Sequence, residues 1–564
     1  MNRISTAGWL GFAAGLALTG GMLQAETDPP NLLTPHNEVA AVETPPQIVF
    51  STYLGGSEQD SGFAVAVDEA GNVYVGGSTS SADIPGTAGG YDWPPYALYP
   101  WPEAYFSKTD NFVTKLAPDG SLRFTAFVGG PWPDSVWGIT VGASSVYLAG
   151  RAMGGDSSNA WVAWLPKEAV GPGGGFFEYY VGGYWSWPYV ADIALDPSGH
   201  MIVTGGLGMM CGIGDPVGIV AKLDGYHRHY LTFLEGVAWW TNALAVDEQG
   251  NAYIAGYKLN WIGPGGCFPQ TEGDVLVAKL DPDGKVVWVR TFGEGENDSA
   301  DDIALSPEGI LYVLGRFGDP EPNAPDRPFL AAMTLEGDVL YSVELEASRA
   351  SQLAVDRAGG LYLLAGSSVL RLDPRDLRVI RSAELPGASV WAFTVDSGGH
   401  AVLTGTPRAG FPVVNAFQPA PGGGHSDDAF VTKIAMNRPP DCSAAVVASS
   451  TLWPPNGRLI PIGVHGITEA DGDPFTLTFT EVRQDEPLSR PGTPDAAGVG
   501  TGALFLRSDR AGKGDGRVYH VAFEARDVLG AACAGEITVC VPHDARNGAA
   551  CGDGGAVVDS SFGG

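Results

Sequence analysis

A short pattern of apolar and polar residues recurs along most of the chain. Each copy has an apolar run, usually an Asp, a Gly-containing turn, a second apolar run and then Gly. The seven copies are AVAVDEAGNVYVGG (64–77), ITVGASSVYLAG (139–150), IALDPSGHMIVTGG (193–206), LAVDEQGNAYIAG (244–256), IALSPEGILYVLG (303–315), LAVDRAGGLYLLAG (353–366) and FTVDSGGHAVLTG (393–405). Two apolar runs around a tight turn predict two antiparallel strands. A period of roughly 40–70 residues indicates a repeat architecture rather than one compact core.

A second strand–turn–strand pattern lies between the copies, for example at 110–130, 217–236 and 273–295. One repeat therefore contains four strands, A to D, which is the content of a propeller blade. The array begins with a D-like strand, QIVFSTYLGG (47–56), and ends with a C-like strand, DDAFVTKIA (427–435). We expect the first strand to complete the last blade, because this closes the ring and removes two exposed sheet edges. The sequence therefore predicts an all-β, seven-bladed propeller closed by its N-terminal strand.

Two segments carry a resemblance to a known family. Residues 50–85 (FSTYLGGSEQDSGFAVAVDEAGNVYVGGSTSSADIP) and 409–434 (AGFPVVNAFQPAPGGGHSDDAFVTKI) resemble the bacterial β-propeller repeat called SBBP. The resemblance implies a seven-bladed propeller in an exported bacterial protein. It implies no enzymatic activity and supplies no catalytic residues.

The pattern stops at Met436, and strands of another kind follow. The segment VYHVAFEARDVLGAACAGEITVCV (518–541) looks like the last strands of immunoglobulin-like modules of the cadherin and hyalin-repeat type. We therefore predict a propeller over 47–436, a small β-sandwich over 437–545 and a loose Gly-rich tail over 546–564.

The N-terminus predicts export. Residues 1–25 have a basic start, an apolar stretch and a small-residue cleavage site, which is typical of a secretory signal peptide, and the Pro- and Glu-bearing residues 26–46 read as a linker. No later segment is apolar for long enough to cross a bilayer. We expect a secreted, periplasmic or cell-surface protein.

The charge balance limits the partners. Lys and Arg number 32 against 64 Asp and Glu, a net charge of −32. Nucleic acid and anionic membranes both need a basic surface, so this balance argues against either as a partner. The acidic surface favours solubility. The sequence sets no oligomeric state.

The even number of cysteines in an exported chain suggests disulfides. Cys211 and Cys267 fall in B–C loops of neighbouring blades, on one face of the ring, and we expect them to pair. The remaining four cysteines belong to the C-terminal module and allow three connectivities. We prefer Cys442–Cys533 with Cys540–Cys551.

The same face gathers tryptophans in the loops that enter the inner strands. The candidate ligand-binding residues are Trp132, Trp137, Trp185, Trp187, Trp239 and Trp240. Such residues form an aromatic platform for a sugar, a peptide or another apolar ligand, because Trp combines a large flat face with a polar N–H. The alternative is that long loops simply use large side chains to pack against one another.

Acidic residues recur in two settings. The repeated Asp68, Asp196, Asp247, Asp356 and Asp396 precede the A–B turn, where we expect them to accept backbone hydrogen bonds. The loop EADGDP (469–474) resembles a cadherin-type calcium loop. That resemblance makes Asp471 and Asp473, together with Asp527, candidate ligands for Ca²⁺, a cation that prefers oxygen ligands. The alternative is an ordinary acidic turn.

The sequence contains no Gly-rich phosphate loop ending in Lys-Ser/Thr, no HExxH and no G-x-S-x-G motif. These observations favour an exported, non-enzymatic binding or adhesion protein whose propeller face recognises a polysaccharide or a protein ligand. Two alternatives stay open: a secreted propeller lyase or hydrolase acting on a glycan or glycopeptide, and a structural component of the cell envelope.

Overall fold

The protein was analysed as a computed structural model. It describes residues 47–87, 110–128, 134–154, 157–168, 175–179, 186–209, 217–238, 240–259, 273–293, 297–318, 327–345, 350–423, 428–490, 492–512, 514–544 and 551–561. The predicted signal peptide and linker lie outside these residues. Within them, no helix is long and apolar enough to span a bilayer.

The repeats form four-stranded antiparallel sheets, here called blades 1 to 7. Blades 1 to 3 contain β2 (Asp60–Val67), β3 (Val73–Thr79), β4 (Asp110–Leu116), β5 (Leu122–Val128); β6 (Asp134–Val141), β7 (Ser145–Gly154), β8 (Ser157–Pro166), β9 (Gly175–Tyr179); and β10 (Ser186–Leu195), β11 (Met201–Met209), β12 (Val217–Asp224), β13 (His227–Phe233). Blades 4 and 5 contain β14 (Trp240–Val246), β15 (Ala252–Leu259), β16 (Gly273–Leu280), β17 (Val286–Phe292); and β18 (Ser299–Leu305), β19 (Ile310–Phe317), β20 (Arg327–Thr334), β21 (Val339–Glu344). Blades 6 and 7 contain β22 (Ala350–Val355), β23 (Leu361–Ala365), β24 (Ser368–Leu372), β25 (Val379–Glu384); and β26 (Ala388–Val395), β27 (His400–Pro407), β28 (Ala429–Ala435), β1 (Gln47–Leu54).

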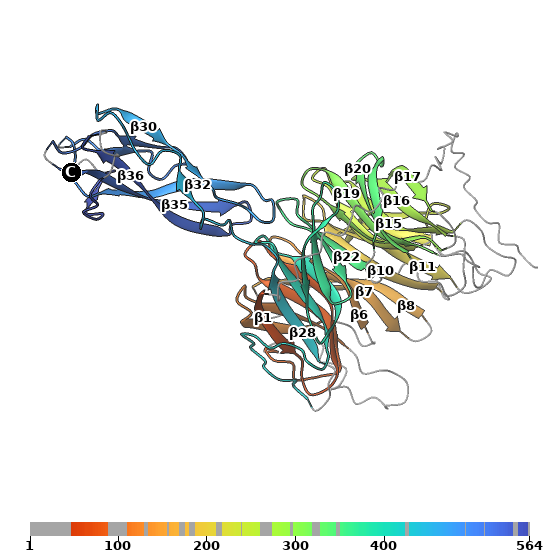
Figure 1. Cartoon of the computed structure of the whole chain (residues 1–564). Helices are drawn as coiled ribbons and strands as arrows, with labels where there is room; N and C mark the ends of the chain where they lie inside the picture. The colour runs from red at the N-terminus through yellow and green to blue at the C-terminus, as the bar shows by residue number, and fades with distance from the viewer. Residues whose placement is uncertain are drawn as a thin grey trace, which may run out of the picture.

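The blades pack around a common axis (Figure 1). Each inner strand contacts the inner strands of both neighbours in the order β2, β6, β10, β14, β18, β22, β26 and back to β2. The apolar core lies between blades: Tyr253 of blade 4 and Val313 of blade 5, for example, share one buried cluster. Each sheet has two buried faces because its alternating residues pack on both neighbours. The all-β propeller fold is thus confirmed.

Strand β1, the first strand in the sequence, belongs to the last blade. It pairs antiparallel with β28, from Gln47 opposite Ala435 to Leu54 opposite Ala429. The Ser51 and Thr432 hydroxyls lie 2.8 Å apart, and Phe50 is fully buried. This pairing covers the outer edge of β28 and one edge of β1, which becomes the outer strand of the blade.

The A–B turns form as expected. In each copy that carries the Asp, one carboxylate oxygen accepts the N–H groups two and four residues later: in blade 1, Ala70 and Asn72 donate to Asp68 at 3.0 and 2.9 Å. The same pairs of bonds occur at Asp196, Asp247, Asp356 and Asp396. A Gly with positive φ, such as Gly71 at 80°, closes the turn.

The C-terminal strands form sheets of their own. They are β29 (Val446–Val447), β30 (Leu459–Ile462), β31 (Val464–His465), β32 (Phe475–Gln484), β33 (Ala496–Ala497), β34 (Leu504–Arg507), β35 (Gly516–Asp527), β36 (Ala532–Pro542) and β37 (Val558–Asp559). The main sheet has the order β36-β35-β32-β37, and β30-β34-β33 form a second one. A separate core that includes Phe479, Leu506 and Tyr519 is buried among them. The immunoglobulin-like assignment and the boundaries at 437 and 545 stay predictions.

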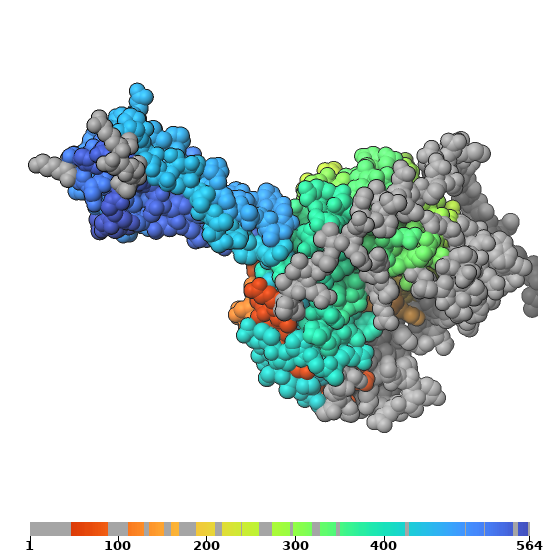
Figure 2. All heavy atoms as spheres, viewed as in Figure 1, coloured from red at the N-terminus to blue at the C-terminus, as the bar shows by residue number. Residues whose placement is uncertain are grey.

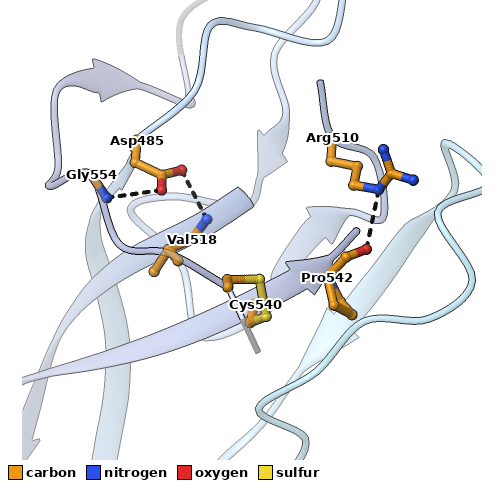
Figure 3. Close-up of a disulfide and its surroundings, with 7 residues drawn as sticks. Asp485, Arg510, Val518, Cys540, Pro542 and Gly554 are labelled. Carbon is orange, nitrogen blue, oxygen red and sulfur yellow. Dashed lines mark hydrogen bonds between the residues drawn. A yellow bond between two sulfur atoms is a disulfide. The ribbon is translucent and has the colours of Figure 1, made fainter. Parts of the chain in front are cut away.

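Two disulfides hold these strands, with the preferred connectivity: Cys442–Cys533 and Cys540–Cys551. Figure 3 shows the second one, beside Asp485, which accepts the N–H groups of Val518 and Gly554 at 2.9 and 3.2 Å. Cys211 and Cys267 lie outside the described residues, so their pairing stays a prediction.

The C-terminal strands extend away from the ring and meet it near blades 6 and 7 (Figures 1 and 2). At the junction Arg371 of β24, which is 1% exposed, donates from Nη2 to both oxygens of Asp473 at 2.8 Å. Its Nη1 lies 3.2 Å from Asp471. Asn437 donates to Asp527 at 2.9 Å. The junction therefore lies at the A–B and C–D turns and leaves the opposite face of the propeller free of this contact.

Candidate ligand-binding pocket

A pocket of about 420 Å³ lies on the face opposite the junction. It is lined by residues at the start of A strands and the end of B strands in blades 2, 3 and 4: Trp137, Arg151, Tyr189, Gly208, Trp240, Asn242 and Tyr257. Its size is in the range of small-ligand sites, which are typically about 300–1,000 Å³.

Three aromatic rings form one continuous wall. The ring centroids of Trp137 and Tyr189 are 5.4 Å apart, and those of Tyr189 and Trp240 are 5.0 Å apart with an interplanar angle of 30°. Tyr189 and Trp240 occupy corresponding positions of neighbouring blades, which explains the near-stacked geometry. Gly206 makes room for them, since a Cβ there would lie 2.8 Å from Tyr189 Cε1 and 3.1 Å from Trp240 Cε3.

Arg151 supplies the positive charge of the pocket. Its Nε is buried without a hydrogen-bond partner, and within the described residues no carboxylate forms an ion pair with its guanidinium. Burial lowers the pKa of Arg151, yet an arginine stays protonated in proteins. An unpaired guanidinium beside aromatic rings is suited to a carboxylate, because its planar fork matches the two oxygens.

The pocket also presents neutral hydroxyl groups. Burial raises the pKa of Tyr257 to about 12, and burial likewise raises the pKa of Tyr189, with a smaller contribution from Tyr257. Both phenols therefore stay protonated at neutral pH and are able to donate hydrogen bonds.

Two of the six candidate tryptophans line this pocket. Trp137 is 41% exposed and Trp240 is partly exposed. Trp132, Trp185 and Trp239 lie outside the described residues, and for Trp187 only the backbone, in β10, is described. These four stay predictions as ligand contacts.

Arg151, Tyr189 and Tyr257 were not anticipated from the sequence. A signal for two of them existed: Arg151 and Tyr257 each follow the Gly that ends the repeated pattern, in GR (150–151) and GY (256–257). This position sits at the end of a B strand on the pocket face.

Two carboxyl groups lie inside the ring close to this face. Asp192 of β10 accepts the N–H of Leu244 in blade 4 at 2.8 Å, and Asp302 of β18 accepts the N–H of Leu353 in blade 6 at 2.6 Å. Burial raises the pKa of Asp192 to about 6. Burial, and to a lesser degree the charge of Asp192, raise the pKa of Asp302 to about 7. Each side chain links its blade to the next through backbone hydrogen bonds.

The candidate calcium ligands lie at the junction. Carboxylate oxygens of Glu469, Asp471 and Asp473 come within 4.8 Å of one another. Arg438 donates from its backbone N and Nε to Asp471 at 2.6 and 2.7 Å, and Arg371 binds Asp473 from the other side. Asp527 instead accepts the N–H groups of Leu529 and Ala531 in its own turn. Calcium binding here stays a prediction, and the ion would compete with these two arginines for the carboxylates.

Comparison with known proteins finds one family model and solved structures of low similarity. The family model described as SBBP, a β-propeller repeat, matches residues 49–85. The crystal structure of the WD40 β-propeller domain of Doa1 is 13% identical, with a TM-score of 0.40, and covers 70% of this chain and 97% of that one. A protein of unknown function from Bacteroides caccae is 14% identical, with a TM-score of 0.30, over 46% of this chain and 82% of that one. No curated protein sequence matches the chain.

The matched residues 49–85 cover most of β1 and the A and B strands of blade 1, which is the stretch that closes the ring and starts the next blade. The sheets then repeat the same order of strands around the axis. Residues 49–85 therefore match an SBBP β-propeller repeat, within a chain whose repeated sheets form a β-propeller.

Proposed function

We propose that this protein is an exported binding protein whose pocket between blades 2, 3 and 4 holds a polysaccharide that bears carboxylate groups. The observation that carries the proposal is the aromatic wall of Trp137, Tyr189 and Trp240 beside the unpaired guanidinium of Arg151. A propeller is a suitable scaffold, since its loops surround one face of a rigid ring.

The chemistry of the wall and the charge are complementary to a uronic acid. The C–H face of a sugar ring packs on an indole or phenol ring, and the ring hydroxyls are then free to bond Tyr257 and Asn242 at the rim. A carboxylate on the same sugar would pair with Arg151 through two parallel hydrogen bonds. Because the protein has a net charge of −32, the rest of its surface repels an anionic chain. A cationic side chain in the pocket, here Arg151, is therefore needed to hold the carboxylate of the sugar.

Export rests on the signal-like residues 1–25 and on two disulfides, which persist in oxidising compartments. The C-terminal module, over 437–545, would act as a spacer or as a second contact surface. Its junction lies on the opposite side of the ring from the pocket and leaves the pocket face accessible to a long polymer.

The test is binding of the full mature chain to polygalacturonate, alginate and a neutral glucan, measured by calorimetry. Trp240→Ala should weaken binding of an acidic glycan by at least about tenfold, which corresponds to 1.4 kcal/mol. Arg151→Gln should remove the preference for acidic over neutral glycans. Trp391→Ala is the matched control, since Trp391 is 51% exposed and occupies in blade 7 the repeat position that Trp137 occupies in blade 2.

Equal losses for Trp240→Ala and Trp391→Ala would refute the assignment of the pocket. Absence of binding to every acidic glycan, with binding to an acidic peptide library that depends on Trp240, would replace the polysaccharide by a peptide ligand.

A secreted lyase or hydrolase is the second candidate, and the pair Asp192 and Asp302 favours it. Their raised pKa values of about 6 and 7 are in the range of a general acid or base. Release of new reducing ends or unsaturated sugars from the bound glycan, lost in Asp192→Asn, would establish an enzyme. Binding without any bond cleavage would leave both carboxyls with the structural role described above.

A further inference from the structure

We propose that blade 3 binds a divalent transition-metal ion of the zinc class through His200, Asp224 and His229. The three residues lie on the propeller face opposite the aromatic pocket, at the A–B and C–D turns. Each offers one ligand atom, and these atoms lie within 4.8 Å of one another. The imidazole rings of His200 and His229 have centroids 4.7 Å apart, and Nε2 of His200 is 4.0 Å from Oδ2 of Asp224.

His200 is already oriented as a ligand. Its Nδ1 lies 3.2 Å from Oδ2 of Asp196, and Lys222 holds the same oxygen at 2.7 Å. A carboxylate that accepts the Nδ1–H leaves the Nε2 lone pair directed at Asp224. Metal-bound histidines are oriented by such carboxylates in the same way.

A β-bulge brings in His229. In the C–D hairpin, Leu223 pairs with Arg228 and Lys222 pairs with Tyr230, so His229 is the extra residue without a partner on β12. A bulge turns its side chain out of the regular alternation of the strand. His229 and Asp224 are both exposed, and so their side chains are free to move the short distance that coordination requires.

Blade 7 provides an internal comparison. Asp396, His400 and Lys433 repeat the arrangement of Asp196, His200 and Lys222, with His400 Nδ1 2.9 Å and Lys433 Nζ 2.6 Å from the Asp396 carboxylate. The register of β28 with β1 places Val49 and Ala435 where blade 3 has His229 and Asp224. The Asp–His–Lys unit therefore belongs to the scaffold, and what is particular to blade 3 is the second imidazole and the second carboxylate.

The donor set selects the ion. Two imidazole nitrogens and one carboxylate oxygen suit Zn²⁺, whereas Ca²⁺ and Mg²⁺ prefer sites made of oxygen. Zinc bonds of about 2.0–2.2 Å in a tetrahedron require the three atoms to approach to roughly 3.4 Å. Three protein ligands leave the fourth coordination position of the metal open for a water molecule or for a group on a partner.

The experiment uses the full mature chain after treatment with EDTA, titrated with ZnCl₂ by calorimetry and with CoCl₂ by visible absorption. We expect one Zn²⁺ site that His229→Ala weakens by more than about tenfold, and a tetrahedral Co²⁺ spectrum that His229→Ala abolishes. Asp196→Asn should weaken binding by about 10- to 100-fold, as for other residues that orient a ligand. His400→Ala is the matched control and should change nothing.

Because His229 is an exposed hairpin residue, its Ala variant is expected to fold, and an unchanged thermal midpoint in EDTA verifies this. Zinc binding that is equal in the wild type and in His229→Ala would place the ion elsewhere and overturn the proposal. Absence of zinc binding to the wild type would overturn it as well.

Discussion

Replacing Arg371 by Met is expected to loosen the junction between propeller and C-terminal module. The guanidinium is 1% exposed and contacts Asp473, Asp471 and Asn437 at 2.8, 3.2 and 3.3 Å. Methionine fills a similar volume but leaves Asp473 without its counter-charge, whereas Asp471 keeps its ion pair with Arg438. Removing one partner of a buried ion pair typically costs about 3–5 kcal/mol, because an uncompensated charge is left in a poorly solvated site.

Hydrogen exchange at the junction measures this cost locally. The N–H of Arg438 is bound to Asp471 at 2.6 Å and exchanges when the junction opens. A loss of about 3 kcal/mol raises the open population by roughly 100-fold, and the exchange rate of the Arg438 N–H should rise by the same factor. Arg375→Met is the control: its side chain is 81% exposed, and ion pairs made by exposed side chains contribute little to stability.

If Arg371→Met and Arg375→Met accelerate exchange of the Arg438 N–H to the same extent, then the buried pair does not hold the junction. Adding Asp473→Asn to Arg371→Met should slow the exchange again, since the unpaired charge is then removed. The same set of variants tests calcium, because loss of Arg371 frees the carboxylates and should increase any protection by Ca²⁺.

Three further outcomes are expected. Removing Cys442–Cys533 by Ser substitution should destabilise the module by about 4–5 kcal/mol and removing Cys540–Cys551 by about 3 kcal/mol, since the closed segments span 91 and 11 residues; urea unfolding measures both, and the reverse order would contradict the argument. The pKa of Asp302 is raised from 3.8 to about 7, so the folded state holds an extra proton between these values and stability falls as pH rises through this window. In thermal unfolding, the midpoint of Asp302→Asn should therefore rise relative to that of the wild type from pH 5 to pH 8. Phe50→Ala should cost about 3–5 kcal/mol, because the ring is fully buried where β1 closes the ring; a cost as small as that of Val49→Ala would mean that β1 is dispensable.

The propeller was predictable because its signal is repeated. One Asp before a turn says little, but Asp68 and its counterparts in four other blades mark the same turn, and each accepts the same two N–H groups in the structure. The split repeat at residues 47–56 and 427–435 predicted the pairing of β1 with β28 for the same reason.

The site was predictable only in part, since it depends on departures from the repeat. Trp137 and Trp240 were identified as aromatic residues on the right face. Arg151 was missed, because its role depends on the lack of a carboxylate partner among the described residues, and a sequence does not show which carboxylates lie near a guanidinium. The same limit applies to Asp473, whose partner Arg371 is 102 residues away in the chain.

The antiparallel pairing of β1 with β28 has a mechanical consequence. Gln47, where the chain enters the ring, lies opposite Ala435, where it leaves. A tensile load applied between these two points acts on the end of the ladder and breaks its hydrogen bonds one at a time, as in unzipping, rather than shearing them together. If the protein is tethered at its N-terminal side and pulled through its C-terminal module, blade 7 would be the first to open. Until blade 7 opens, the Arg371 junction would carry part of the load into blade 6.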